Sequence, residues 1–265
     1  MRKNSINLNG ITVTYNDNGK GKPIVLLHGF CGSKGYWDNL ITTLSEHYRV
    51  IALDLPGHGE SANLEETGTI EDIADHIKDV LDYLHISQVT MFGHSLGGYI
   101  TLAFAEKYSQ MVNGFSLIHS TAFPDTEEAK KGREAGVEKV KQEGITTFID
   151  GLIPKLFSPD NVEKNKNEIK TAKEIGYTTT PQGAMKTLIA MKNRPDRNHV
   201  LESAAIPVLL IAGEKDQIIP PEKTFSVDKS TIKHVLLKDS GHMSMYENPS
   251  ELIHQMFEFL NTLKY

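Results

Sequence analysis

The stretch from Val89 to Ala105, VTMFGHSLGGYITLAFA, decides how the rest of the chain is interpreted. Its apolar beginning predicts a buried strand, and its apolar end predicts a helix that starts directly after Ser95. A serine at so sharp a turn needs small neighbours, and the glycines of the stretch meet that need. The helix directs its unpaired N–H groups and the positive end of its dipole toward any oxyanion formed beside the serine. The stretch therefore predicts a nucleophilic serine.

Short apolar runs on both sides of this stretch predict the remaining sheet. Runs without alternation are typical of strands buried on both faces, as in a parallel sheet covered by helices. Besides residues 89–92, they occupy residues 24–27, 50–53, 115–118, 208–211 and 235–237. Amphipathic helical segments lie between them, and an Asn9-Gly10 turn predicts an antiparallel hairpin at the start. The alternation predicts an α/β fold with a mostly parallel central sheet flanked by helices.

The alternation of strand and helix stops between residues 122 and 203. This stretch holds 14 basic and 13 acidic residues, and its apolar residues between Ile145 and Leu156 recur at helical spacing. Gly151 and Pro154 are expected to bend that helix. We therefore expect a core domain of residues 1–121 and 204–265, with a helical cap, or lid, of residues 122–203.

Two residues far along the chain are the candidate partners of the serine. A serine hydroxyl needs a base to take its proton, and the base needs a group that orients it. Catalytic groups in parallel sheets gather at the carboxyl ends of the strands. Asp216 and His242 follow the fifth and sixth parallel runs. We predict a catalytic set of Ser95, Asp216 and His242.

Other carboxylates compete with Asp216 for the role of the acid. Glu214 is the main rival, because it lies two residues nearer the end of its strand. Asp239 is disfavoured because it belongs to the loop that carries the histidine. The fourth parallel run is followed by no carboxylate before Asp125, which disfavours an acid on that strand.

The GHSLG motif in its strand-to-helix context, and the order Ser95, Asp216, His242, resemble the α/β-hydrolase fold family. The resemblance covers about residues 5–121 and 204–263 and points to carboxylesterases, enol-lactonases and C–C hydrolases. The segment from His28 to Gly32 is similar to the family's His-Gly oxyanion loop. The resemblance implies that the backbone N–H groups of Phe30 and Leu96 form the oxyanion hole. It assigns residues 54–61 a structural role at the base of the pocket.

Seven residues are candidates for the substrate pocket. Four lie beside the predicted serine turn or at strand ends, and three lie on the apolar faces of the expected cap. They are His28, Gly29, His94, His119, Phe148, Leu152 and Met185.

Composition and motifs limit the possible ligands. The chain has 265 residues and a formal net charge of -6, which argues against nucleic acid and anionic membranes as partners. Cys31 is the only cysteine, so no intrachain disulfide can form. Neither the 11 histidines nor the glycine-rich loops have the spacing of a metal site, a phosphate loop or a dinucleotide fingerprint, so we expect no metal and no cofactor.

The sequence also suggests a location. The first residues, MRKNS, are not followed by the apolar core of a signal peptide, and no apolar run approaches the length of a membrane span. The expected location is the cytoplasm. No oligomeric state is assigned.

These patterns together predict a cofactor-independent serine hydrolase that cleaves a small ester or lactone through an acyl-enzyme on Ser95. The same residues serve C–C bond hydrolases and peroxide-using relatives in the family, which are the alternatives within the enzyme class. A ligand-binding signalling module with slow turnover is the alternative of another class. Steady turnover of a short-chain p-nitrophenyl ester separates an enzyme from such a module, which would show slow or single turnover and thermal stabilisation by its ligand.

Overall fold

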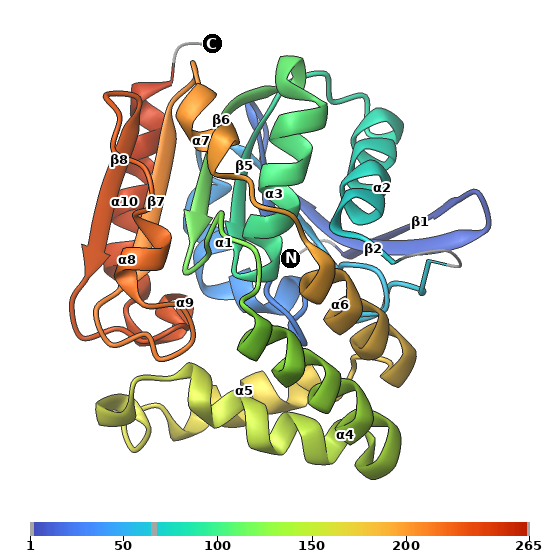
Figure 1. The fold of residues 1–265 in the computed structure, drawn as a ribbon. Coiled ribbons are helices and arrows are strands. Elements are labelled where there is room, and N and C mark those ends of the chain that lie inside the picture. Colours follow the sequence, from blue (N-terminus) through green and yellow to red (C-terminus); the bar gives the residue numbers. More distant parts are fainter. Residues whose placement is uncertain (1–2, 65–67, 264–265) are drawn as a thin grey trace.

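The computed structural model describes residues 3–64 and 68–263, so the extreme ends of the predicted core lie outside the described residues. The described residues form a sheet of eight strands in the order β1-β2-β4-β3-β5-β6-β7-β8 (Figure 1). The strands are β1 (Lys3–Leu8), β2 (Ile11–Asn18), β3 (Pro23–Leu27), β4 (Arg49–Leu53), β5 (Val89–His94), β6 (Val112–Ile118), β7 (Val208–Gly213) and β8 (Ile232–Leu237).

The strand directions confirm the predicted fold class. The pairs that β3 to β8 form with one another are all parallel, and each apolar run of the sequence lies within one of these strands. The hairpin of β1 and β2 is antiparallel and closes with Leu8 opposite Ile11. Asn9 and Gly10 have φ values of 53° and 87°, the left-handed conformation that a two-residue hairpin turn requires. The sheet is therefore mostly parallel, with an antiparallel edge.

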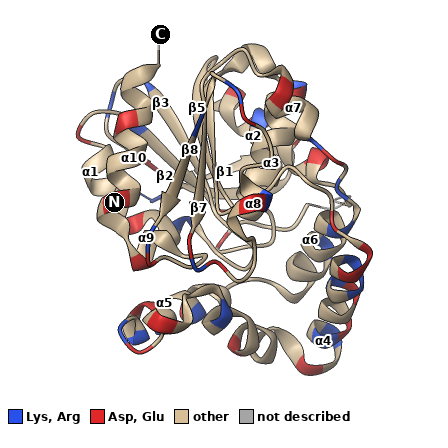
Figure 2. Cartoon of the chain, turned by 60° about the vertical axis from the view of Figure 1, so that its left-hand side comes forward, with Lys and Arg blue, Asp and Glu red and all other residues tan. Residues whose placement is uncertain are grey.

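Helices cover both faces of the sheet (Figures 1 and 2). The helices of the two layers are α1 (Asp38–Leu44), α2 (Ile70–Tyr83), α3 (Leu96–Lys107) and α10 (Pro249–Thr262). Alternate residues of β3 point to opposite faces: Val25 belongs to the apolar cluster that α2 and α3 cover, and Leu26 belongs to the cluster that α1 and α10 cover. Burial on both faces explains why β3 to β7 are continuous apolar runs, whereas the edge strand β8 leaves Leu236 exposed. A capping box formed by Thr69 and Asp72 begins α2.

A group of helices is inserted between β6 and β7; most of it lies beyond one end of the sheet, whereas its last helix lies near the opposite end (Figure 1). These elements are α4 (Glu127–Leu152), η3 (Ile153–Leu156), η4 (Pro159–Asn161), α5 (Lys166–Gly176), α6 (Pro181–Asn193) and α7 (Asn198–Ser203). Charged residues of both signs are distributed along α4 and α5 (Figure 2). We call these elements the inserted helices.

The predicted bend at Gly151 is wrong. The helix α4 continues through Gly151 to Leu152, and its kink lies at Gly144, which has φ 82° and ψ 167°. A glycine adopts this backbone conformation readily because it has no Cβ, so the kink forms where the chain must turn rather than at each glycine. Pro154 lies within the short η3 element that follows the helix.

Four short helical elements complete the description: η1 (Lys34–Trp37), η2 (Ser109–Met111), α8 (Pro221–Thr224) and α9 (Ser244–Glu247). In residues 3–64 and 68–263, no helix combines the length and the apolar character that crossing a membrane demands.

Candidate active site

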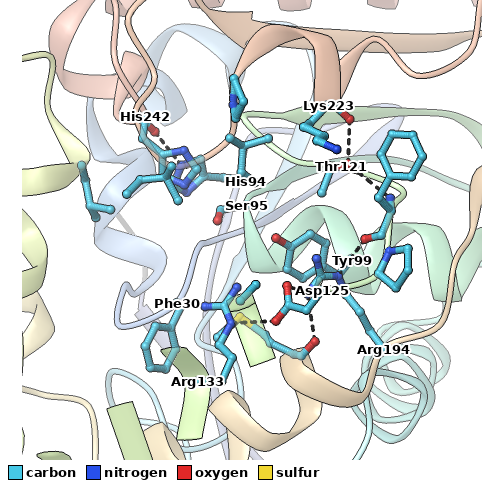
Figure 3. Close-up of a pocket in the computed structure, with 18 of the residues that line it drawn as sticks. Phe30, His94, Ser95, Tyr99, Thr121, Asp125, Arg133, Arg194, Lys223 and His242 are labelled. Carbon is cyan, nitrogen blue, oxygen red and sulfur yellow. Dashed lines mark hydrogen bonds and ion pairs between the residues drawn. The ribbon is translucent and has the colours of Figure 1, made fainter. Parts of the chain in front are cut away.

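Ser95 lies at the turn between β5 and α3, with φ 50° and ψ −112°. This conformation is costly for a residue with a side chain, so the surrounding structure must hold it. A Cβ at Gly93 or Gly97 would collide with a backbone carbonyl of a neighbouring element. Because these positions are glycines, the turn can close and the serine lies at the wall of a cavity (Figure 3).

Asp216 and His242 come together from the ends of β7 and β8. The Nδ1 atom of His242 lies 2.7 Å from Oδ2 of Asp216, and both side chains are buried. The other carboxylate oxygen, Oδ1, accepts the backbone N–H groups of Ile218 at 2.8 Å and Ile219 at 3.0 Å. These bonds fix the carboxylate, and the carboxylate in turn fixes the imidazole ring. His242 and Ser95 line the same cavity.

The two rival carboxylates have other partners. Glu214 is exposed and accepts the backbone N–H of Asp239 at 3.3 Å. Asp239 pairs with Lys215 at 3.0 Å and its side chain is 80% exposed. Of the three candidate acids, Asp216 is the one that hydrogen-bonds to His242.

The charge on Asp216 is strongly favoured. Burial alone would raise the pKa of this carboxyl, but the charges and hydrogen bonds of His242 and His119 outweigh burial and hold the pKa well below its usual range. Asp216 is therefore ionised at neutral pH, as a group that stabilises an imidazolium must be.

Two further histidines surround His242. His94 contacts the backbone carbonyl of His242 through Nε2 at 2.8 Å, and its ring centroid lies 5.0 Å from that of His242. His119 places Nδ1 3.5 Å from Oδ2 of Asp216 and Nε2 2.7 Å from the hydroxyl of Ser244. Burial lowers the pKa of both His94 and His119, which favours their neutral forms. These histidines fix the loop that carries His242.

The two predicted oxyanion donors have unengaged backbone groups. Leu96 is the first residue of α3, so its N–H has no partner within the helix. Phe30 lines the cavity from the loop after β3. Across the described residues, no backbone hydrogen bond outside the regular elements is donated by Phe30 or Leu96.

Asp54, the first acidic residue after β4, holds the loop that follows this strand. The carboxylate of Asp54 accepts the backbone N–H groups of Lys34 at 2.8 Å and Glu60 at 3.1 Å, and the Thr14 hydroxyl at 2.6 Å. One buried carboxylate thus joins three segments, which is a structural role rather than a chemical one.

The cavity beside Ser95 has a volume of about 270 Å³. The core contributes Ser95 and His242, and the loop after β7 adds Ile218 and Ile219. The inserted helices and the loops beside them contribute the opposite walls, with Leu152, Leu156, Met191, Arg133 and Arg194. A small substrate in this cavity would contact both the core and the inserted helices.

Two of the seven candidate pocket residues, His94 and Leu152, line this cavity. The other five are described residues that do not belong to its lining: His28, Gly29, His119, Phe148 and Met185. His28 instead accepts the N–H of Leu55 at 2.9 Å, and Phe148 packs edge-on against Phe30 with ring centroids 6.0 Å apart. His119 lies behind the Asp216 carboxylate.

Six polar residues that the sequence patterns did not identify as site residues also line the cavity. They are Tyr99, Thr121, Asp125, Arg133, Arg194 and Lys223 (Figure 3). Asp125 and Arg194 are 69 residues apart and meet through Nη1 and Oδ1 at 2.6 Å. No local pattern links residues so far apart, so only the fold reveals the group. Among the described residues, no set of three His, Cys, Asp or Glu side chains is arranged to hold a metal ion.

The chain belongs to the alpha/beta hydrolase fold family, whose sequence model matches residues 22–249. The matched region includes the Ser95 turn and the Asp216–His242 pair, so the family model covers the candidate active site.

Individual relatives carry several activities in their names. The chain is 30% identical, over 91% of its length, to the dihydrolipoyllysine-residue acetyltransferase component of an acetoin cleaving system from Pseudomonas putida, of which it spans 64%. It is 26% identical, over 97% of its length and 90% of the relative, to 2-hydroxy-6-oxo-6-(2'-aminophenyl)hexa-2,4-dienoic acid hydrolase from Metapseudomonas resinovorans. A solved structure of a thermophilic esterase from Thermogutta terrifontis with bound malate matches with a TM-score of 0.92, 28% identity and 98% coverage of both chains.

Proposed function

We propose that the chain is a cofactor-independent serine hydrolase that cleaves a small ester or lactone through an acyl-enzyme on Ser95. The observation that carries the proposal is the cavity whose wall holds both Ser95 and His242, with His242 bonded to Asp216. Membership of a hydrolase family and similarity to a thermophilic esterase support it.

The chemistry follows from the roles of the three side chains. The Ser95 oxygen attacks the substrate carbonyl carbon while Nε2 of His242 takes its proton, and the imidazolium then protonates the leaving oxygen. Water next attacks the acyl carbon, its proton passes to His242, and the Ser95 oxygen leaves and regains a proton. Asp216 keeps Nδ1 of the imidazole protonated, so Nε2 is free to accept.

The charge that develops on the carbonyl oxygen needs donors already in place. In the proposed mechanism the N–H groups of Phe30 and Leu96 bind this oxyanion, and the positive end of the α3 dipole adds to the stabilisation. Fixed donors do not need to reorganise during the reaction, which is why they lower the barrier.

We also propose that residues 122–203 form a cap that roofs the cavity. The carboxylate of Glu247 accepts the N–H of Gly241, beside His242, and the N–H of Ser158, on the inserted stretch, both at 2.9 Å. The backbone N–H of His242 donates to the carbonyl of Leu156 at 2.8 Å. These bonds tie the proposed roof directly to the catalytic loop, so the cap defines the space available to the acyl group.

Steady-state hydrolysis of p-nitrophenyl butyrate tests the proposed function. We expect continuous release of p-nitrophenol at a rate proportional to enzyme concentration. A single turnover followed by arrest, together with thermal stabilisation by the bound compound, would instead favour a ligand-binding module.

The pH dependence of kcat/KM is expected to show one acidic limb. Asp216 stays ionised near neutrality because its pKa is held well below its usual range, and burial keeps His94 and His119 toward their neutral forms. The base must be neutral to accept the serine proton, so kcat/KM should fall on the acidic side, where the base takes up a proton. A flat profile from about pH 5 to 8, with chemistry limiting and the fold intact, contradicts this mechanism.

Truncation of the cap is expected to change acyl-chain preference. Leu152→Ala enlarges the cavity directly, and Phe148→Ala removes the ring that packs on Phe30, so both should shift the preferred ester toward longer chains. Met185→Ala is the control, because Met185 does not line the cavity. Rates are compared only for variants that fold, since truncating a large side chain that is well buried costs about 2–5 kcal/mol.

The rate of labelling by a small phosphonate gives the second readout for these variants. Labelling needs only the catalytic side chains and the oxyanion donors. Its rate should therefore stay within about threefold of the parent rate, which corresponds to a change of about 0.7 kcal/mol or less in the activation barrier. Unchanged chain-length profiles in both Leu152→Ala and Phe148→Ala would show that the inserted helices do not select the substrate.

A further inference from the structure

Two arginines and one aspartate form a charged wall of the cavity beside Ser95 (Figure 3). Asp125 accepts Nε of Arg133 at 3.0 Å on one oxygen and Nη1 of Arg194 at 2.6 Å on the other. The side chains of Asp125 and Arg194 are 4% and 5% exposed, and that of Arg133 is 27% exposed. A single carboxylate thus lies between two guanidinium groups.

Arg194 is held by several partners within the protein. Besides Asp125, Nη1 donates to the carbonyl of Met191 at 2.9 Å, and Nε donates to the carbonyl of Phe123 at 3.2 Å. Its guanidinium lies over the ring of Tyr99, 4.0 Å from the centroid. Three of the five N–H donors of Arg194 are therefore engaged by the protein, and these bonds fix the position of Asp125.

Within the described residues, Arg133 uses only some of its N–H donors. A guanidinium has five N–H donors, and Arg133 uses Nε for Asp125 and shares a hydrogen bond with Tyr99. Among the described residues, Asp125 is the one carboxylate within ion-pair distance of Arg133. The remaining N–H groups form the fork that binds carboxylates in a bidentate manner.

The charges of the lining do not cancel. Arg133, Arg194 and Lys223 oppose Asp125 alone, and within residues 3–64 and 68–263 no carboxylate pairs with Lys223. Lys223 instead lies over the Phe123 ring, 5.1 Å from its centroid. Lys223 is exposed to solvent, and together with the two arginines it gives the lining a net positive charge, which attracts anions.

We infer that the cavity binds a substrate whose acyl part carries a carboxylate, and that Arg133 binds this carboxylate while Arg194 and Lys223 add positive potential. The inference rests on the proposed function, because it assigns the substrate class of the same site. Carboxylates of this kind are ionised at neutral pH. A half-ester of a short dicarboxylic acid meets these requirements, with its ester at Ser95 and its free carboxylate at Arg133.

Matched substrates test the inference. Monoethyl succinate, glutarate and adipate are each compared with the neutral ethyl ester in which an isopropyl group replaces the carboxylate, and ethanol release gives kcat/KM. The parent enzyme should prefer the acidic member for at least one chain length, and added salt should reduce that preference. Arg133→Met should lower the ratio of acidic to neutral kcat/KM by about 10- to 100-fold, the effect of a lost charge-assisted hydrogen bond.

Two further variants separate charge from geometry. Lys131→Met removes the same charge from an exposed position of the same helix and should leave the ratio unchanged. Arg133→Lys keeps the charge but loses the planar fork, so its ratio should fall between those of the parent and Arg133→Met.

A binding measurement makes the inference independent of hydrolysis. In Ser95→Ala, glutarate should raise Tm more than the neutral diamide glutaramide does, and Arg133→Met in that background should abolish the difference. If no ester is hydrolysed but glutarate still stabilises selectively, the proposed function fails and the anion site stands. Ester hydrolysis without acid preference, together with equal effects of glutarate and glutaramide, would overturn the inference and leave Arg133 as a structural tie.

Discussion

Ser95→Ala is expected to lower kcat/KM for p-nitrophenyl butyrate by about 10⁴-fold or more. The serine oxygen is the atom that forms the acyl bond in the proposed mechanism, and alanine removes it without adding bulk to the strained turn. The backbone conformation at residue 95 is set by the glycines around it, so the fold should survive. The measurement is the steady-state rate of protein that has the parent circular dichroism spectrum and Tm.

The control for Ser95→Ala is a serine outside the cavity. Ser203 donates to the carbonyl of His199 at the end of α7, far along the chain from the catalytic turn. Ser203→Ala should keep the parent rate. A folded Ser95→Ala protein with near-parental activity would show that another residue performs the hydrolysis.

Asp216→Asn is expected to lower kcat by about 10⁴-fold. The amide oxygen can still accept the N–H groups of Ile218 and Ile219, so the loop should remain in place. The amide nitrogen would then face Nδ1 of His242 as a donor and favour the tautomer with Nδ1 unprotonated. In that tautomer Nε2 carries the proton and cannot act as the base, so the rate falls although the geometry is preserved.

Glu214→Gln and Asp239→Asn are the matched controls for Asp216→Asn. Each removes one carboxylate from the same edge of the sheet, but neither Glu214 nor Asp239 contacts His242. Both should stay within about tenfold of the parent rate, a difference of 1.4 kcal/mol in the barrier. If Glu214→Gln lost the activity and Asp216→Asn kept it, the assignment of the acid would be wrong.

The fold was predictable because its signals are local. The parallel strands β3 to β7 are buried on both faces and therefore read as uninterrupted apolar runs, as in residues 24–27 and 208–211. The turn at Ser95 was visible because a close approach of backbones demands glycine at Gly93 and Gly97. Asp216 and His242 followed strand ends whose positions were already fixed by the pattern of the sheet.

The cavity wall was less predictable because its contacts are distant in sequence. Arg194 contacts Asp125 across 69 residues, and a lysine- and arginine-rich insertion offers no local sign of which cation faces the cavity. His119 was expected beside the substrate, whereas the structure places it against Asp216, because β6 ends next to β7. The kink of α4 lies at Gly144 rather than Gly151, since packing of the whole insertion decides where the helix turns.

The central claim is that Ser95 is the nucleophile, and covalent labelling tests it most directly. A small p-nitrophenyl phosphonate should add one phosphonyl group per chain, and peptide mass spectrometry should locate it on Ser95 within the segment 92–98. His242→Ala should slow the labelling severely, because the base that activates the hydroxyl is lost. Rapid labelling of a different residue, or undiminished ester hydrolysis by protein that the phosphonate does not label, would contradict the account.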